Sequence, residues 1–150
     1  MGIALLLHLL GVVVWVGGMF FAYMALRPVA VSVLEPPQRL NLWAGVFAKF
    51  FPWVWLSIAL ILGSGLYMWM ALGGMAAPAY VWVMMGLGIV MMLIFAHVFF
   101  AAFKKLKRAV ADQAWPAGGA ALGQIRMLIG INLSIGLITI VVAILGRALA

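Results

Sequence analysis

The chain has 150 residues, of which 69% are hydrophobic, only 7% are charged and none is cysteine. A soluble domain carries roughly 25% charged residues, so a water-soluble globular protein is excluded, as are disulfides, thiolate metal sites and iron–sulfur clusters. The net charge of +7 is better explained by basic membrane loops than by nucleic-acid binding, so we expect the lipid bilayer as partner and no nucleic acid.

The hydrophobic pattern predicts an all-α integral membrane four-helix bundle, formed by a single domain over residues 1–150. About 20 apolar residues are needed for a helix to cross the bilayer. Four stretches are long enough, at about 3–26, 50–72, 79–103 and 127–146. The first lacks a basic start and is longer than the core of a signal peptide, so we expect a retained helix.

The segment before the second span predicts a helical extension of that span. Pro36-Pro37 suits a first helical turn, and Leu40, Trp43 and Phe47 then recur at helical spacing. We expect this cytoplasmic extension to run into the second span with a bend near Pro52.

Basic residues predict the orientation of the bundle. Eight of the nine lie in the first and third loops, and only Arg147 lies at the other side. Because cytoplasmic loops collect Lys and Arg, both termini are expected outside the cell inner membrane.

The two histidines are the residues with the most direct chemistry, because an ionisable side chain inside a membrane is costly and a neutral imidazole is a common metal ligand. His8 is expected roughly 8 Å below the outer boundary, and His97 roughly 9 Å above the inner one. At such different depths they are poor candidates to bind one haem iron together.

The helix face around His8 has two interpretations. Gly11, Trp15 and Gly18 share a narrow sector with His8. This face could accept a flat ligand, or it could be a glycine-mediated contact with another helix. For His8 itself, the alternative to metal binding is a packed histidine bonded to a backbone carbonyl.

Three further groups also have two interpretations each. His97, just before a basic run, is either a second ligand or proton relay, or an interfacial histidine that only packs. The outer methionines could bind Cu(I), or they could fill helix interfaces. Arg126 could bind an anionic head group or carboxylate, or it could serve only as an orientation signal. The methionines in question are Met68, Met70, Met75, Met84 and Met85.

The stretch from His8 to Phe20 resembles the first helix of the CopD-type and HemJ-type membrane families. Those families have a histidine, a tryptophan seven residues later, then Gly or Ala-Gly and an aromatic residue, as in His8, Trp15, Gly17, Gly18 and Phe20. The third span is similar, with Trp82 fifteen residues before His97, and so is the opening of the fourth at Arg126.

This resemblance implies two functions. HemJ-type proteins are protoporphyrinogen oxidases that bind haem b, and the CopD type implies copper resistance or uptake. Where the HemJ pattern has a histidine and a lysine at the outer end of the third helix, this chain has Met84 and Gly86. That departure argues against porphyrinogen oxidation and suggests His8 with Met84, or the adjacent Met85, as a haem ligand pair.

The leading hypothesis is therefore a haem b-binding redox protein that transfers electrons or oxidises a porphyrin or quinol, with a quinone or redox partner. The alternatives are a CopD-like copper-handling protein without haem and a non-catalytic membrane subunit. Glycine-bearing faces also predict a homodimer. The candidate cofactor- or metal-binding residues are His8, Gly11, Trp15, Met84, Met85, His97 and Arg126.

Overall fold

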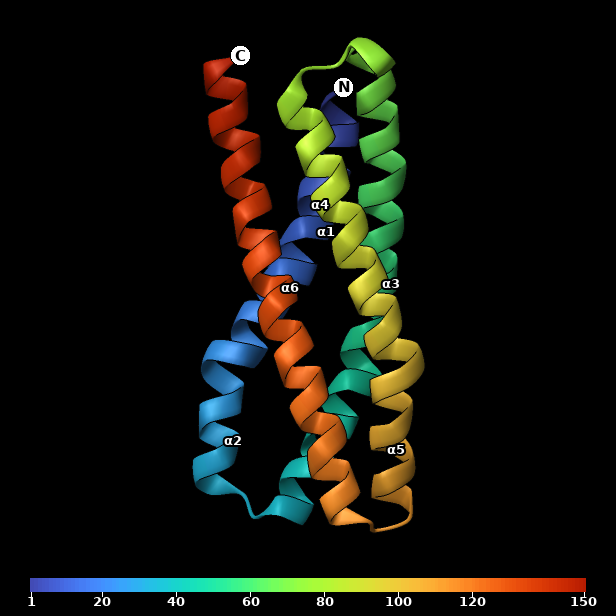
Figure 1. The fold of residues 1–150 in the computed structure, drawn as a ribbon, viewed down its shortest axis with the longest axis vertical. Coiled ribbons are helices and arrows are strands. Elements are labelled where there is room, and N and C mark those ends of the chain that lie inside the picture. The colour runs from blue at the N-terminus through green and yellow to red at the C-terminus, as the bar shows by residue number, and fades with distance from the viewer.

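The computed structural model describes all 150 residues and consists of four long helices joined by short turns (Figure 1). Each helix is long and apolar enough to cross a membrane. The predicted all-α membrane four-helix bundle is confirmed. The four continuous helices are Gly2–Val33, Pro36–Ala71, Ala79–Ala111 and Trp115–Leu149.

Two of the four helices contain a π-helical turn. The first consists of α1 (Gly2–Phe21), the π turn η1 (Ala22–Leu26) and α2 (Arg27–Val33). The third consists of α4 (Ala79–His97), the π turn η3 (Val98–Ala102) and α5 (Phe103–Ala111). The second and fourth are uninterrupted and are labelled α3 (Pro36–Ala71) and α6 (Trp115–Leu149).

All four helices are longer than a bilayer requires. They have 32 to 36 residues, whereas about 20 suffice to cross the hydrocarbon core. The sequence predicted an extension of the second helix only. The first helix instead continues through Arg27 and Pro28, because the amide of Arg27 bonds to the Ala22 carbonyl in the π turn and Pro28 lies in the first turn of α2.

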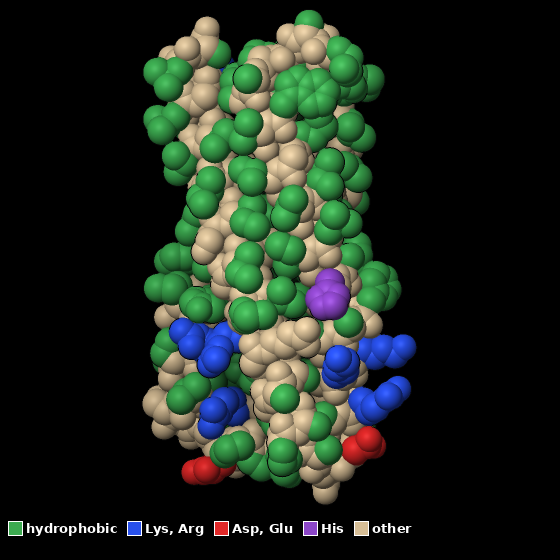
Figure 2. Space-filling model, viewed as in Figure 1, with side chains coloured by type: hydrophobic (Ala, Val, Ile, Leu, Met, Phe, Trp, Pro, Cys, Tyr) green, Lys and Arg blue, Asp and Glu red, His purple; other side chains and the backbone are tan.

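The bundle has two distinct ends. Both termini and the turn between α3 and α4 lie at one end, which we call the terminal end (Figure 1). The other two turns lie at the opposite end, which we call the basic end because Lys and Arg side chains gather near it (Figure 2). At the terminal end the tight turn depends on Gly73 and Gly74, whose φ angles of 101° and 58° are unfavourable for other residues. The 3-10 turn η2 (Gly74–Ala76) completes this connection.

An aromatic cluster forms the core in the half of the bundle nearer the basic end. Phe51 of α3 stacks on Phe47 at 4.9 Å and meets Phe103 edge-on at 4.9 Å and Phe95 at 5.2 Å. Leu40, Trp43 and Phe47 are all buried, as the helical spacing predicted for this extension. α3 remains one helix through Pro52, and its two halves run in different directions in Figure 1, as expected near an interior proline.

Candidate functional site

His8 lies on α1 and is held by α3. Its Nδ1 atom is 3.0 Å from the hydroxyl oxygen of Ser64. The Ser64 hydroxyl is within hydrogen-bond reach of the Leu60 and Ile61 carbonyls of its own helix, and when it donates to either of them its oxygen can accept from His8. With the Ser64 hydroxyl bonded to its own helix, Nδ1 of His8 is the protonated nitrogen and Nε2 keeps a free lone pair, the form in which imidazole binds metals.

The glycine face of α1 is covered by α3. A Cβ atom on Gly11 would lie 2.8 Å from the side chain of Ile61 and 3.0 Å from the carbonyl oxygen of Ser57. A Cβ on Gly18 would overlap the ring of Phe50. In this structure Gly11 and Gly18 are thus positions of close helix–helix packing, and the space beside them is filled by α3 rather than open to a flat ligand.

Trp15 belongs to the core. It is 2% exposed, and its ring meets the ring of Phe95 edge-on at 6.2 Å. Trp15 lies two helical turns from His8. Through its contact with Phe95, its indole contributes to the packing of α1 against the third helix.

Met84 and Met85 lie on α4, and both are half-buried. α4 packs mainly against α6, whereas α1 packs mainly against α3. The sequence predicted that His8 and Met84 share a depth in the membrane. In the structure they lie on α1 and α4, and neither of these helices is the main packing partner of the other.

Met68 lies on the face of α3 that contacts His8. His8 contacts Ser64 and Gly65 on α3, where a Cβ on Gly65 would lie 3.4 Å from Cε1 of the imidazole. Met68 follows these residues by four and three positions, so it lies on the same face of α3 one turn toward the terminal end. Long helical side chains tend to lean toward the helix N-terminus, which for Met68 is the direction of Ser64 and Gly65. The sequence grouped Met68 with the outer methionines, but only the contact partners of His8 distinguish it from them.

No second acidic or histidine ligand accompanies His8. The chain contains no group of three or more His, Cys, Asp or Glu side chains that could hold a metal ion. His97, the last residue of α4, is exposed and makes no side-chain hydrogen bond. A metal at His8 would thus have to take its other ligands from thioethers or from backbone oxygens.

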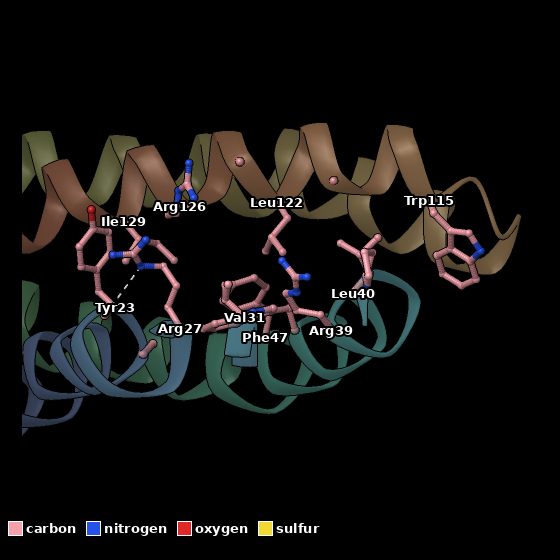
Figure 3. A pocket seen from close by; sticks show the side chains of 15 residues that line it. Tyr23, Arg27, Val31, Arg39, Leu40, Phe47, Trp115, Leu122, Arg126 and Ile129 are labelled. Carbon is pink, nitrogen blue, oxygen red and sulfur yellow. Dashed lines mark hydrogen bonds between the residues drawn. The ribbon is translucent and has the colours of Figure 1, made fainter. Parts of the chain in front are cut away.

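Arg126 lies toward the opposite end of the molecule from His8, on the wall of a cavity. This cavity has a volume of about 230 Å³ and is enclosed by η1, α2, α3 and α6 near the basic end (Figure 3). His8, Met84 and His97 do not line it.

Comparison with known proteins gives one match. The family model for copper resistance protein D matches residues 44–145, which include the larger part of α3 and extend through α4 and α5 into α6. α1, which carries His8, precedes the match. No curated protein and no solved structure matches the chain significantly. Since the match covers 102 of the 150 residues (145 − 44 + 1), this multi-pass membrane protein belongs to the copper resistance protein D family.

Proposed function

We propose that the protein handles copper in the membrane by binding Cu(I) through Nε2 of His8. The observation that carries this proposal is the hydrogen bond between His8 Nδ1 and Ser64, because it leaves Nε2 unprotonated. Membership of the copper resistance protein D family supports copper as the metal. Copper is here the transported or sequestered substrate rather than a resident cofactor.

The chemistry of Cu(I) suits the side chains near His8. This soft ion favours thioether sulfur and imidazole nitrogen, and the chain has no thiolate to offer. Met68, on the face of α3 that His8 contacts, is the proposed sulfur ligand. Ser64 would act as the residue that holds the imidazole in one orientation, as hydrogen-bond partners of metal-bound histidines commonly do.

The proposed orientation places this site on the outer side of the inner membrane. With the basic end in the cytoplasm, both termini and His8 face outward. Copper arriving from outside would then meet His8 before it reached the centre of the bundle.

A haem b redox role is the second candidate, and the same free Nε2 atom favours it. An imidazole with one nitrogen held by a hydrogen bond is also the usual proximal ligand of haem iron. A haem at His8 would need a second ligand such as Met84 and room outside the closed contact between α1 and α3. A quinone or another electron carrier would then be the redox partner.

Titration of the purified protein with Cu(I) against a chromophoric chelator tests the copper proposal. We expect one tightly bound Cu(I) per chain, lost in His8→Ala and weakened about tenfold or more in Met68→Leu, since a first-row metal loses much affinity with each ligand. Met75→Leu is the matched control, because Met75 is 80% exposed and should not matter.

Three outcomes would reject the copper site. If His8→Ala still binds one Cu(I) per chain, His8 is not the main copper ligand. A haem Soret band that shifts on reduction and disappears in His8→Ala would favour the redox candidate instead. A wild-type protein that binds neither copper nor haem would favour a non-catalytic membrane subunit.

A further inference from the structure

The cavity at the basic end is built by three helices that all extend beyond the apolar spans. It runs from the level of Arg27 and Arg126, where the spans end in the sequence, toward Pro36 and Trp115 at the tip of the bundle. Its volume of about 230 Å³ far exceeds the space that a single water molecule needs. Figure 3 shows it between α6 on one side and α2 and α3 on the other.

The charge around this cavity has one sign. Three arginines line it, one from each wall: Arg27 from α2, Arg39 from α3 and Arg126 from α6. No Asp or Glu lines it. Glu35, the nearest acidic residue in the sequence, is engaged in capping α3 together with Gln38. No acidic side chain in the cavity wall offsets the charges of these arginines.

The guanidinium groups retain most of their hydrogen-bond donors. Arg27 donates from Nε to the Tyr23 carbonyl and lies 4.5 Å from the centre of the Tyr23 ring. Arg39 donates once, to the Leu34 carbonyl, and its Nε is buried with no partner. Arg126 makes no hydrogen bond to the protein. Since each guanidinium has five N–H donors, Arg27 and Arg39 keep free donors at the cavity, and a buried Nε without a partner is costly. Arg126 is exposed and does not point toward the other two in Figure 3, so it would contribute from the rim of the cavity.

The remaining walls are apolar and partly open. Trp43, Phe47 and Leu122 present hydrophobic surface to the cavity, and Gly119 and Gly123 of α6 lie one turn apart along it. A Cβ atom on either glycine would meet nothing within 4 Å. The glycines are thus not needed for helix packing here, and the space in front of them belongs to the cavity.

We infer that this cavity is a binding site for an oxyanion, a phosphate or a carboxylate, that is attached to an apolar or aromatic body. The guanidinium group of arginine can form two parallel hydrogen bonds to a phosphate or a carboxylate. Such charge-assisted hydrogen bonds are stronger than those between neutral groups. The apolar walls would take the body of the ligand. Neither the family match nor the copper proposal assigns this site, and it lies at the other end of the bundle from His8.

Two sources could supply such a ligand. The head group of an anionic lipid could enter from the bilayer at the level of Arg27 and Arg126. A soluble organic anion could enter from the aqueous phase at the tip of the bundle. The chemistry that the cavity recognises is the same, so the test uses one probe for each source.

In the first arm, the protein in phosphatidylcholine nanodiscs is titrated with naphthyl phosphate by calorimetry. In the second, native mass spectrometry compares retention of phosphatidylglycerol and phosphatidylcholine of equal chain length. We expect saturable binding of one ligand per chain in at least one arm. Arg39→Gln should weaken it about tenfold or more, because a charge-assisted bond is lost, and Gly123→Leu should abolish it by filling the cavity.

Matched controls separate this site from general electrostatic attraction. Gly45→Leu adds the same side chain at an exposed helical glycine outside the cavity, and Lys105→Gln removes a positive charge elsewhere at the basic end. Both should change binding by no more than about twofold, as exposed charges contribute little. Gly119→Leu provides a second cavity-filling variant if Gly123→Leu does not assemble.

Each outcome decides the inference. Loss of naphthyl phosphate binding in the cavity variants supports a soluble anion, and loss of phosphatidylglycerol preference supports a lipid. Absence of saturable binding in both arms would overturn the inference. So would binding that falls equally in the cavity variants and in the two controls.

Discussion

The imidazole of His8 and the hydroxyl of Ser64, 56 residues apart in sequence, are joined by a 3.0 Å hydrogen bond between α1 and α3. Ser64 is buried and its hydroxyl is already bonded to its own helix. The contact therefore does more than satisfy a polar group. When Ser64 is bonded to its own helix, the contact favours the His8 tautomer whose other nitrogen is the proposed Cu(I) ligand.

Removal of the Ser64 hydroxyl should weaken metal binding without removing a ligand. In Ser64→Ala, Nδ1 of His8 loses its acceptor, and the ring loses both its orientation and its preferred tautomer. We expect Cu(I) affinity to fall about 10- to 100-fold, the usual effect of such a partner, measured by chelator competition. Ser64→Thr, which keeps the hydroxyl, should retain most of the affinity. Unchanged binding in Ser64→Ala would show that the hydrogen bond plays no part.

The close contact of α1 with α3 predicts a sharp difference between two adjacent glycines. Gly18→Ala places a Cβ into the ring of Phe50, whereas Gly17→Ala meets nothing within 4 Å. We expect Gly18→Ala to lower the free energy of unfolding by about 1–3 kcal/mol through overpacking and Gly17→Ala to leave it nearly unchanged. Thermal unfolding in detergent measures both. Equal stability of the two variants would contradict the packing of α1 on α3.

A buried amide links the third and fourth helices. Asn132 of α6 is 3% exposed and donates from Nδ2 to the Met91 carbonyl of α4 at 3.2 Å. Asn132→Ala should cost about 1 kcal/mol, within the range measured for hydrogen bonds between membrane helices. Ser134→Ala serves as the control, since Ser134 is exposed and bonds only within α6. An effect no larger than that of Ser134→Ala would mean that the amide does not hold α4 to α6.

The aromatic core predicts a large effect at Phe51. Its ring contacts aromatic rings from both α3 and the third helix, and Phe51→Ala should therefore cost about 3–5 kcal/mol. Phe100→Ala removes the same ring where it is 64% exposed and should be close to neutral. Urea or detergent-denaturation curves followed by circular dichroism give both values. Similar losses in the two variants would contradict the location of the core.

The orientation of the bundle in the membrane can be tested by labelling single introduced cysteines, because the chain has no cysteine of its own that would react. A membrane-impermeant maleimide should label Ala150→Cys in intact cells, since the terminal end is proposed to face outward. Asp112→Cys, in the turn at the basic end, should be labelled only after permeabilisation. The reverse pattern would invert the bundle and place His8 on the cytoplasmic side.

Much of the architecture follows from the sequence alone. Four apolar stretches of sufficient length require four membrane helices, because backbone groups in lipid must be bonded within a helix. Leu40, Trp43 and Phe47 at helical spacing correctly indicated that α3 begins well before its apolar part. The continuation of the first helix through Arg27 and Pro28 was missed, because the π turn that accommodates the proline has no marker in the sequence.

The site was less accessible to sequence reasoning. The identity of His8 as the leading ligand candidate came from its type and its apolar surroundings, which a single sequence displays. The proposed second ligand could not be chosen in this way, since Met68 and Met84 are both apolar, unbranched and near the terminal end of their helices. The contacts of His8 with Ser64 and near Gly65 place Met68 on the face of α3 that meets α1. The arginine cavity was equally hidden, because Arg27, Arg39 and Arg126 come from three segments far apart in the chain.

The sequence by itself determined which segments are helical, how many of them cross the membrane and at which end the charges collect. These properties depend only on the hydropathy and length of contiguous segments. Only the tertiary structure decided which helix lies against which. It showed that α3 packs against the glycines of α1, that Ser64 is hydrogen-bonded to His8 and that three arginines line one cavity. Those relationships depend on the rotation and register of packed helices, which shape complementarity between distant segments sets.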